Sequence, residues 1–479
     1  MNRPLFSVCC CLLFSLTSPA EGPSSSKARI KRIEEGLTDT VLLKGRPVQH
    51  YTLVQRMEKY HVRGLSVAVV DRGKVVWSSG YGLADVKSNR AVDARTMFQA
   101  GSISKPVAAV AAMKFVQMGR LNLDENVNQQ LKSWHVPENE FTKDQKVTLR
   151  RLLSHSAGLT VHGFAGYAAG TPVPTVQQVL DGQKPANSDP IRVDVVPGTL
   201  FRYSGGGYTV MQLLLTECAG ESFAEVLKKT VLDPIGMKNS TYEQPLPAAL
   251  RDRVAFGYRG DGSPLPGDFH TYPELAAAGL WTTAPDLAKF GIAIQKSREG
   301  GSDRVLSQKT TQLMLTRQKE DDGLGFFLEG SGAEERFGHN GANEGFQALM
   351  LFTFDGKGLA IMTNSDNGLR VAQELAYSIG AEYGWKDYGP KTRAAVSVSP
   401  ADLSSVTGKY QIPHGPLLTV QPAGDHLTAL VGQDRYDLYP ESLNKYFSLS
   451  QGVPDLTFSR NAAGKMEVVI GTLHVQREE

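Results

Sequence analysis

The sequence predicts an α+β fold: an antiparallel sheet flanked by helices, a mostly helical subdomain, and a small antiparallel β-domain at the C-terminal end. Strand-like runs occur at 64–79 and again at 345–364, and residues 120–320 between them are mostly helical patterns and Gly/Pro-rich loops. Strands at both ends of a helical middle predict that the two ends share one antiparallel sheet. Short alternating runs follow residue 401 at a spacing of about ten residues, as in a small barrel or sandwich.

The patterns within residues 45–385 follow one another in a clear order. Runs 64–71 and 74–79 are rich in β-branched residues, and Asp71-Arg72-Gly73 between them is a hairpin signal. The other expected elements are helices at 102–118, 208–218, 222–229, 284–297 and 369–381, and strands at 324–329, 345–354 and 358–364.

The C-terminal part of the chain has a different pattern. Residues 386–400 are an expected linker, and residues 401–479 are an expected small β-barrel or sandwich domain. Turn sequences such as Pro422-Ala423-Gly424-Asp425 separate its strands. Those strands are expected at 417–421, 427–431, 436–439, 446–449, 456–458 and 466–470.

The first 20 residues have the pattern of a secretory signal peptide. Arg3 supplies a positive charge, residues 5–16 are apolar, and Ser18-Pro19-Ala20 offers small residues for cleavage. The apolar run is too short to cross a bilayer as a helix, so no stable membrane span is expected. The cysteines at 9–11 lie inside this run rather than after it, which disfavours a lipoprotein anchor. We therefore expect a secreted or periplasmic protein whose mature N-terminal segment is 21–44.

Composition and missing motifs exclude several classes of protein. Lys+Arg total 51 and Asp+Glu total 49, a net charge of +2 that is too even for a nucleic-acid-binding surface. The motifs G-x-S-x-G, H-E-x-x-H, Walker A and C-x-x-C are absent, and the ten histidines show no metal-ligand spacing. We expect no nucleic-acid partner, no metal and no organic cofactor.

A Ser-x-x-Lys motif is the first candidate for chemistry. It occurs at Ser24/Lys27, Ser102/Lys105 and Ser442/Lys445. Only Ser102 opens a helical pattern, and residues three apart on a helix share a face, which places the Lys105 amine beside the Ser102 hydroxyl. Free N–H groups at a helix start stabilise negative charge. Burial lowers the pKa of a lysine, so that its amine can accept a proton.

A tyrosine motif is the second candidate. Tyr203-Ser204-Gly205 leads into a Gly-rich turn and then a helical pattern. A phenol has a pKa of about 10, and neighbouring positive charge would lower that pKa into a range useful for proton transfer. Tyr258-Arg259-Gly260 has the same Tyr-x-Gly spacing but no helix after it, so Tyr203 is favoured.

A polar, glycine-rich segment at 337–346 is the third candidate. It contains His339-Asn340-Gly341-Ala342 and lies just before an expected strand. A strand edge without bulky side chains would let a substrate backbone pair with it and would present an N–H group to an oxyanion. Glu344 in the same segment is expected to be a loop charge.

The ordered set Ser102-x-x-Lys105, Tyr203-x-Gly205 and His339-x-Gly341 resembles the class C β-lactamase / DD-peptidase superfamily of serine hydrolases. Residues 152–159, Leu-Leu-Ser-His-Ser-Ala-Gly-Leu, also look like that family's sequence. The resemblance covers roughly residues 45–385 and implies a β-lactamase/transpeptidase-like fold. The tail from 401 is similar to the small β-domain appended to some members.

The resemblance implies a role for each motif residue. Ser102 would be the acylated nucleophile and Lys105 its proton partner. Tyr203 would be the general base toward Ser102 and the acid toward the leaving group. The backbone N–H groups of Ser102 and Ala342 would form the oxyanion hole. Substrate contacts would come from His339, Asn340, Gly341 and Gly205.

Two motif positions depart from the family pattern. Gly205 stands where the family usually has Asn, whose amide helps to hold the substrate and the lysine. His339 stands where lactamases usually have Lys, so a permanent positive charge for a substrate carboxylate is missing. Members with His there resemble peptidases and esterases more than lactamases. His155 is expected to be structural.

Together these features predict a secreted serine hydrolase that forms an acyl-enzyme with carboxylic esters or D-amino-acid peptides. A β-lactamase is the alternative within the same family, and a non-catalytic penicillin-binding-like binding or sensor protein is the alternative from another class. The expected partner is a small-molecule or peptide substrate, and the sequence sets no oligomeric state. The tail either binds a ligand of its own or covers one side of the main domain.

Overall fold

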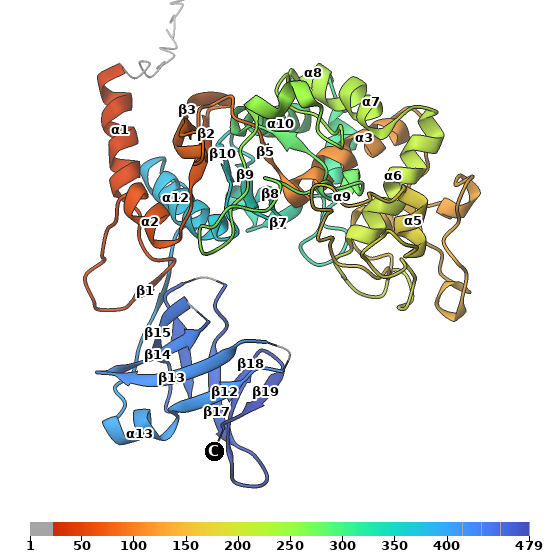
Figure 1. Cartoon of the computed structure of the whole chain (residues 1–479). Coiled ribbons are helices and arrows are strands. Elements are labelled where there is room, and N and C mark those ends of the chain that lie inside the picture. The colour runs from red at the N-terminus through yellow and green to blue at the C-terminus, as the bar shows by residue number, and fades with distance from the viewer. Residues whose placement is uncertain (1–22, 414, 433, 451, 479) are drawn as a thin grey trace, which may run out of the picture.

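The computed structural model describes residues 23–413, 415–432, 434–450 and 452–478. The predicted signal peptide, residues 1–20, lies outside these described residues. A larger α+β body and a smaller β body make up the chain, with the smaller one at the bottom of Figure 1. Within the described ranges, no helix combines the length and the apolar character that a membrane crossing needs.

A seven-stranded antiparallel sheet lies at the centre of the larger body, in the order β4-β3-β2-β10-β9-β8-β7. Strand β2 pairs directly with β10, Leu65 opposite Thr363, so both ends of this body share one sheet, as predicted. The strands are β2 (Gly64–Asp71), β3 (Lys74–Asp85), β4 (Arg90–Ala91), β7 (Phe327–Glu329), β8 (Arg336–Asn343), β9 (Phe346–Thr353) and β10 (Gly358–Thr363).

Helices cover both faces of this sheet because successive side chains of a strand point to opposite sides. On β10, Leu359 and Ile361 pack in the core on one face, and Ala360 and Met362 pack in the core on the other. The strand is therefore apolar on both faces. The first face carries α1 (Pro23–Glu35), α2 (Leu53–Lys59) and α12 (Gly368–Glu382); the second carries α3 (Ser104–Gln117) and α10 (Ala284–Arg298).

The predicted hairpin between β2 and β3 is confirmed. Arg72 and Gly73 have φ values of +50° and +67°, the left-handed conformation that a tight two-residue hairpin turn requires at both positions. The predicted helices at 102–118, 208–218, 284–297 and 369–381 are also confirmed, within a few residues at each end.

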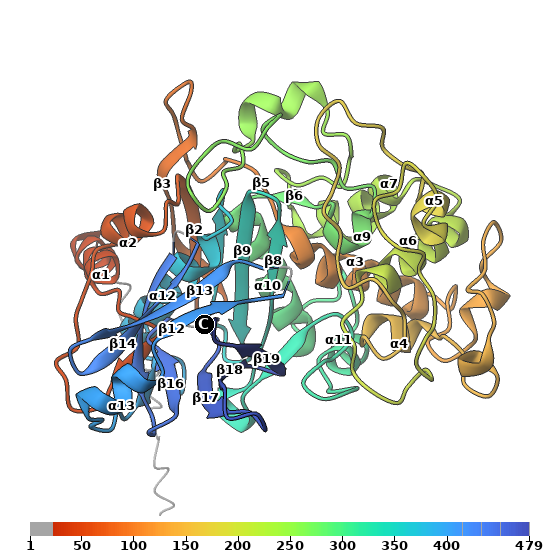
Figure 2. The same ribbon diagram turned by 60° about the horizontal axis from the view of Figure 1, so that its bottom comes forward.

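A mostly helical subdomain lies beyond the β8 side of the sheet, and Figure 2 shows α3 between β8 and α6. Helix α6 begins where Ser204 Oγ accepts a hydrogen bond from Gly207 N, and it ends at Gly220, whose φ is +74°. The helices of this subdomain are α4 (Leu149–Leu153), α5 (Val176–Asp181), α6 (Gly205–Ala219), α7 (Phe223–Leu227), α8 (Asp233–Ile235), α9 (Leu275–Ala278) and α11 (Gln308–Met314). A two-stranded sheet of β5 (Phe98–Gln99) and β6 (Trp281–Thr282) lies beside them.

The smaller body is an antiparallel meander of eight strands around its own apolar core. A bridge between Tyr410 and Arg477 brings the first and last strands together, so the sheet is nearly closed into a barrel. The strands follow α13 (Pro400–Ser405) and are β12 (Gly408–Gln411), β13 (Leu417–Ala423), β14 (His426–Val431), β15 (Asp434–Pro440), β16 (Lys445–Ser448), β17 (Leu456–Arg460), β18 (Met466–Ile470) and β19 (Leu473–Gln476).

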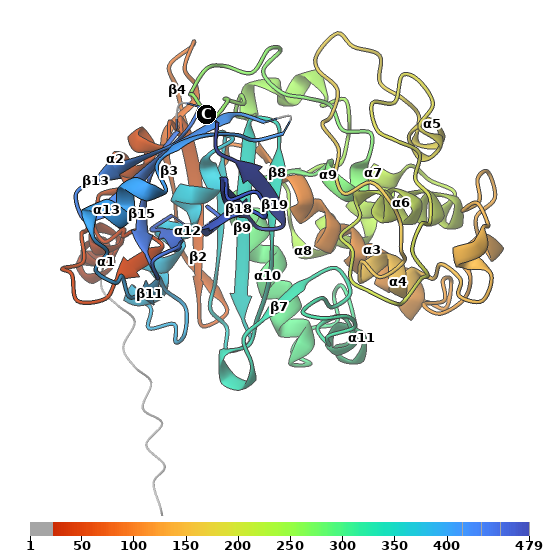
Figure 3. The same cartoon turned by 90° about the horizontal axis from the view of Figure 1, so that it is seen from below.

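Backbone pairing ties the segment before the main sheet to the segment before the barrel. Strand β1 (Val41–Leu43) pairs in parallel with β11 (Lys391–Arg393), which lies within the expected linker. Val41 N also donates to the carbonyl oxygen of Leu449 at 3.0 Å. Figure 3, seen from the barrel's side, shows the blue barrel strands over the region of α12 and away from α4, α5 and α6.

Candidate active site

Ser102 lies in a one-turn 3₁₀ helix, Gly101–Ile103, that runs directly into α3. Two glycines let strand β8 lie against this turn. Gly101 has a φ of +51°, and a Cβ atom on it would lie 2.5 Å from Ala342 N. A Cβ atom on Gly341 would lie 1.9 Å from the carbonyl oxygen of Ala100. The close approach places Ala342 N beside Gly101 and Ser102 N beside Gly341, so the two backbone nitrogens lie near each other.

Lys105 lies one helical turn after Ser102, and its amine contacts the serine hydroxyl. Its Nζ lies 3.0 Å from Ser102 Oγ and donates to the carbonyl oxygen of Ala277 in α9 at 2.9 Å. The side chain is 2% exposed, and this burial lowers its pKa to about 7. No carboxylate within the described residues forms an ion pair with it. The amine is therefore a base that can be neutral at physiological pH.

Tyr203 lies two residues before α6, with its ring facing the lysine. Lys105 Nζ is 4.8 Å from the ring centroid, and the nearby Ser102 side chain acts to lower the pKa of the phenol. Burial raises the pKa of Tyr203, and the charge of Asp322 adds to this increase. The sequence-based expectation of a lowered tyrosine pKa is therefore wrong, because the desolvation of a phenolate outweighs the lowering influence of Ser102. Tyr203 is a neutral phenol here.

His155 supports Tyr203 from behind. The two rings stack with centroids 4.2 Å apart, and His155 Nδ1 accepts a hydrogen bond from Ser204 N at 3.0 Å. Burial lowers the pKa of His155 well below its usual value, so the ring is neutral and can accept this bond. These contacts fit the structural role expected for His155.

His339 in β8 completes the wall of the site. Its ring centroid lies 6.1 Å from that of Tyr203 and 4.8 Å from that of Phe327. Burial, with a smaller contribution from Lys105, lowers the pKa of His339 to about 3. The third-motif position therefore carries no charge at neutral pH.

Asn340 lies on the other face of β8. Side chains alternate along a strand, so His339 faces the site while Asn340 faces the α12 side, opposite Leu349. The Asn340 carbonyl contacts His339 Nδ1, and its exposed side chain lines a cavity between the two bodies. The structure thus brings His339, Gly341 and Ala342 to Ser102, and directs the Asn340 side chain away.

Gly205 opens α6 in a crowded place. A Cβ atom on it would lie 3.0 Å from the Phe164 ring and 3.1 Å from the carbonyl oxygen of His162. Its N–H donates to that same oxygen at 3.0 Å. An asparagine at this position, as in the usual family motif, would therefore require the Phe164 ring and the His162 carbonyl to shift by a few tenths of an ångström.

The outer edge of β8 is open beside the site. Strand β7 pairs only with Arg336–Gly338, so within the described residues β8 has no strand partner on that side from His339 onward. An extended substrate segment could add to this edge by backbone hydrogen bonds. The Gly101–Ile103 turn that carries Ser102 lies against this same strand at Gly341 and Ala342.

Comparison with known families gives the same assignment. A family model described as Beta-lactamase matches residues 52–383, which is more than half of the chain. The chain belongs to the Beta-lactamase family. This family is part of a superfamily of serine hydrolases.

Individual relatives of this Beta-lactamase family chain are distant. Penicillin-binding protein 4* of Bacillus subtilis is 22% identical over 438 residues, which cover 86% of this chain and 94% of that protein. Unguisins hydrolase ungD' of Aspergillus campestris is 29% identical over 259 residues, and the match covers 50% of this chain and 46% of that protein. An octameric penicillin-binding protein homologue from Pyrococcus abyssi has the same fold, with a TM-score of 0.60 and 23% identity over 89% of this chain and 98% of that one.

Other candidates from the sequence lie elsewhere in the molecule. The Tyr258 hydroxyl accepts a hydrogen bond from Val86 N at 2.8 Å, and Glu344 pairs with Arg259 at 3.0 Å near the surface. Ser442 and Lys445 lie in the barrel. No group of three or more metal-ligating side chains occurs among the described residues.

Sequence reasoning missed three residues of the site. Asn343 Nδ2 donates to Gln99 Oε1 at 2.8 Å and to Ala278 O at 3.1 Å, which ties β8 to α9. Phe327 covers His339, and the buried carboxyl of Asp322 has a pKa raised to about 8 by desolvation. Asn343 lies two residues after Gly341, so strand alternation places it on the same face of β8 as His339 and Gly341. This spacing was the one signal in the sequence that could have assigned Asn343 to the site.

Proposed function

We propose that this chain is a serine hydrolase that forms an acyl-enzyme on Ser102 and acts on carboxylic esters or D-amino-acid peptides. The observation that carries the proposal is the buried amine of Lys105, 3.0 Å from Ser102 Oγ, with a pKa of about 7. About half of such amines are neutral at pH 7, and a neutral amine can accept the hydroxyl proton.

Acylation would begin when Ser102 Oγ bonds to the substrate carbonyl carbon and its proton moves to Lys105 Nζ. The carbonyl oxygen becomes an oxyanion that the N–H groups of Ser102 and Ala342 stabilise. The bond to the leaving group then breaks, and the leaving oxygen or nitrogen takes the proton from Lys105. In deacylation, water bonds to the acyl carbon while Lys105 takes one of its protons. The bond between the acyl carbon and Ser102 Oγ then breaks, and Lys105 returns the proton to Ser102 Oγ as the acid leaves.

Tyr203 would relay the proton as a neutral phenol rather than act as a phenolate. Its pKa is raised by burial, whereas the pKa of Lys105 is lowered, so the lysine is the stronger candidate for general base. A neutral phenol can donate its proton to the leaving group and receive one from Lys105 in the same step. Lys105 Nζ lies 4.8 Å from the Tyr203 ring centroid and bonds to Ser102 and Ala277, so this exchange would require the phenol oxygen to come within hydrogen-bond distance of the amine when substrate binds.

The neutral His339 favours substrates with no carboxylate beside the reacting carbonyl. β-Lactams and peptides that end in a D-amino acid carry such a carboxylate, and esters need not. With a pKa of about 3, His339 gives a carboxylate no positive charge at neutral pH. Carboxylic esters are therefore the preferred substrate class, with D-amino-acid peptides next and β-lactams last.

A fluorophosphonate probe tests the nucleophile. Intact-mass spectrometry should find one adduct on the wild type and none on Ser102→Ala. Labelling that persists in Ser102→Ala would overturn the assignment. No labelling of either folded protein would favour a binding protein without turnover. A panel of p-nitrophenyl esters, D-Ala-D-Ala peptides and nitrocefin then ranks the substrate classes, and faster cleavage of nitrocefin than of the esters would contradict the argument from His339.

We also propose export of the protein and a division of the chain at residues 386–400. The support for export is the charge and apolar pattern of residues 1–20. The support for the division is the separate apolar core of the eight-stranded barrel. Sequencing the N-terminus of the protein recovered from its native source tests the first proposal.

A further inference from the structure

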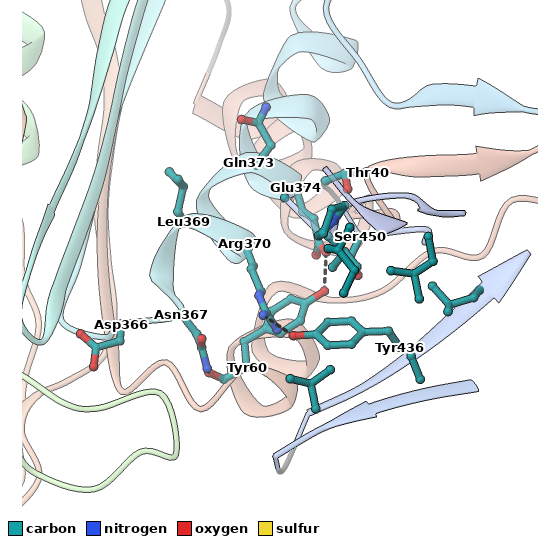
Figure 4. A pocket seen from close by; sticks show the side chains of 18 of the residues that line it. Thr40, Tyr60, Asp366, Asn367, Leu369, Arg370, Gln373, Glu374, Tyr436 and Ser450 are labelled. Atoms are coloured by element: carbon teal, nitrogen blue, oxygen red, sulfur yellow. Dashed lines mark hydrogen bonds between the residues drawn. The ribbon is translucent and has the colours of Figure 1, made fainter. Parts of the chain in front are cut away.

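A cavity of about 570 Å³ lies between the two bodies, apart from the catalytic face of the sheet. Its volume is in the usual range of small-molecule sites, about 300–1,000 Å³. One wall is the first half of α12, and the opposite wall is the open end of the barrel. Figure 4 shows the side chains of both walls pointing into the same space.

The barrel wall of this cavity is aliphatic. Five different strands contribute to it, through side chains that alternate inward along each strand. Leu418, Leu438 and Leu456 belong to the barrel's own buried core, so this core forms the floor of the cavity. Val431 and Ile470 are half-buried at its mouth.

The opposite wall is polar, and its carboxylates are already paired inside the protein. Glu374 binds the buried Arg56 and accepts from the Tyr60 hydroxyl at 2.8 Å. Asp366 accepts from Gly345 N at 2.6 Å. Neither carboxylate therefore needs a cation from a ligand.

Arg370 is the cation at the boundary between the polar and apolar walls. It donates to the Tyr436 hydroxyl at 2.8 Å, and Figure 4 shows the two side chains meeting end to end. Its nearest carboxylate, Asp434, lies 3.9 Å away at the surface. A guanidinium has five N–H donors, so Arg370 can also bind a carboxyl group in the cavity.

The cavity reaches the strand that bears the catalytic amide. Asn340 and Gln347 line it, and Gln347 pairs across the sheet with Ala342. Asn340 and Ala342 lie on the same face of β8, whose outer edge is open at this point. A chain attached to a carbonyl at Ser102 could therefore pass around this edge into the cavity.

We propose that the cavity binds the aliphatic chain of a small carboxylic acid or ester, with the carboxyl end toward Arg370 or toward Ser102. The largely aliphatic barrel wall would exclude water from the chain, and Arg370, the one cation among the described residues that line the cavity, would select an acid over an amine. A free acid and the acyl chain of a substrate share this chemistry. The second case rests on the proposed hydrolase function, and the first does not.

Direct binding tests the cavity without turnover. Ser102→Ala is titrated with the fluorescent fatty acid cis-parinaric acid, and dodecanoate is the competitor. Saturable binding that dodecanoate displaces is expected. In the same background, Val431→Trp should weaken binding about tenfold or more by filling the mouth, because each lost methylene contact reduces affinity several-fold. Val469→Trp is the matched control, since Val469 is equally half-buried on β18 but does not line the cavity.

Absence of saturable binding to Ser102→Ala, or equal binding by the two tryptophan variants, would overturn the proposal. Ile470→Trp replaces Val431→Trp if the latter does not fold, because Ile470 is the neighbour of the control residue and lines the cavity. Arg370→Met should weaken the binding of parinaric acid more than that of its methyl ester. An equal effect on both ligands would show that Arg370 does not bind the carboxyl group.

Ester hydrolysis then distinguishes the two sources of the chain. If the substrate's acyl group enters the cavity, the ratio of kcat/KM for p-nitrophenyl octanoate to that for p-nitrophenyl acetate should fall about tenfold in Val431→Trp and stay constant in Val469→Trp. An unchanged ratio with impaired parinarate binding assigns the cavity to a free acid. If no ester is hydrolysed and the fluorophosphonate does not label the protein, the hydrolase proposal is overturned. The parinarate titration would still show whether the cavity binds an aliphatic acid.

Discussion

The same Ser-x-x-Lys spacing occurs in both bodies of the molecule, and the two lysines have opposite properties. Lys105 is 2% exposed, has no carboxylate partner among the described residues, and has a pKa lowered to about 7 by burial. The Lys445 side chain is 42% exposed, and hydrogen bonds to Glu441 and Asp455 raise its pKa. At neutral pH, only the first of these two lysines can accept a proton.

The serines differ as well. Ser102 lies in the turn that starts α3, beside the backbone N–H of Ala342. Ser442 closes a turn in the barrel, where its Oγ accepts from Lys445 N at 3.2 Å and contacts Asn444. The Ser-x-x-Lys spacing alone therefore does not make a serine and a lysine a catalytic pair. Burial without a counter-charge is what makes the amine a base.

The largest expected difference between the two pairs is in activity. Ser102→Ala should reduce kcat/KM for p-nitrophenyl acetate by at least ~10³-fold, because loss of a nucleophile removes the covalent route. Ser442→Ala should keep the wild-type value. Steady-state kinetics of both purified variants measure this. Similar losses of kcat/KM in both variants would contradict the conclusion that only the Ser102 motif is catalytic.

The next effect concerns the lysines and pH. Lys105→Arg should lower kcat/KM by about 10²–10⁴-fold, since a guanidinium stays protonated and cannot accept the Ser102 proton. In the wild type, kcat/KM should rise with pH through about 7 and then level off, because the neutral amine is the active form. Lys445→Arg should retain both the rate and this profile. A wild-type profile that is flat from pH 5 to pH 9 would argue against Lys105 as the base.

A smaller effect of opposite sign is expected on stability. The folded-state pKa of Lys105 is below its unfolded value, so the unfolded state binds more protons between about pH 7 and pH 10. The buried amine therefore lowers stability most at and below pH 7. Lys105→Met should raise the free energy of unfolding at pH 7 by more than about 1 kcal/mol, and the gain should shrink as the pH rises toward 10. Urea denaturation at several pH values measures it, and a loss of stability at pH 7 would contradict it.

The smallest effect is expected at Lys445. Lys445→Met removes exposed ion pairs, and such pairs contribute little to stability. The free energy of unfolding of the barrel should therefore fall only slightly, and more salt should narrow the difference from wild type. A loss comparable in size to the gain at Lys105 would remove the contrast between a buried and a solvated lysine.

Local signals in the sequence predicted much of the fold. Asp71-Arg72-Gly73 predicted the β2–β3 hairpin because few turns accept two left-handed residues in a row. Strands β12 and β19 were not predicted, since Gly408–Gln411 and Leu473–Gln476 are short and mainly polar. They are strands because each closes an edge of the barrel, which is a tertiary effect that no local pattern shows.

The sequence predicted which residues form the candidate site, but not the direction in which their pKa values shift. Three ordered motifs pointed to Ser102, Lys105 and Tyr203, and the fold brings these side chains together. The pKa of Tyr203 moved opposite to the expectation, because the burial that raises it comes from His155, Phe327 and other residues distant in sequence. Asn340 was grouped with the substrate contacts by adjacency in sequence, and strand alternation turns its side chain to the other face.

The parallel pairing of β1 with β11 gives the barrel a second attachment to the larger body, besides the covalent connection of the chain. Lys44 N donates to Arg393 O, and Val41 N donates to Leu449 O, so the N-terminal segment holds both the connector and the barrel. A single protease cut between residues 386 and 390 would nick the chain, but the barrel would stay fastened through β1. Conversely, deleting the barrel together with β11 would strip the hydrogen-bond partners from β1 in the part that is kept. An excised hydrolase body that ends before residue 391 should therefore keep α1, whose Ile33 packs in the core with α12, and would leave β1 without its strand partner.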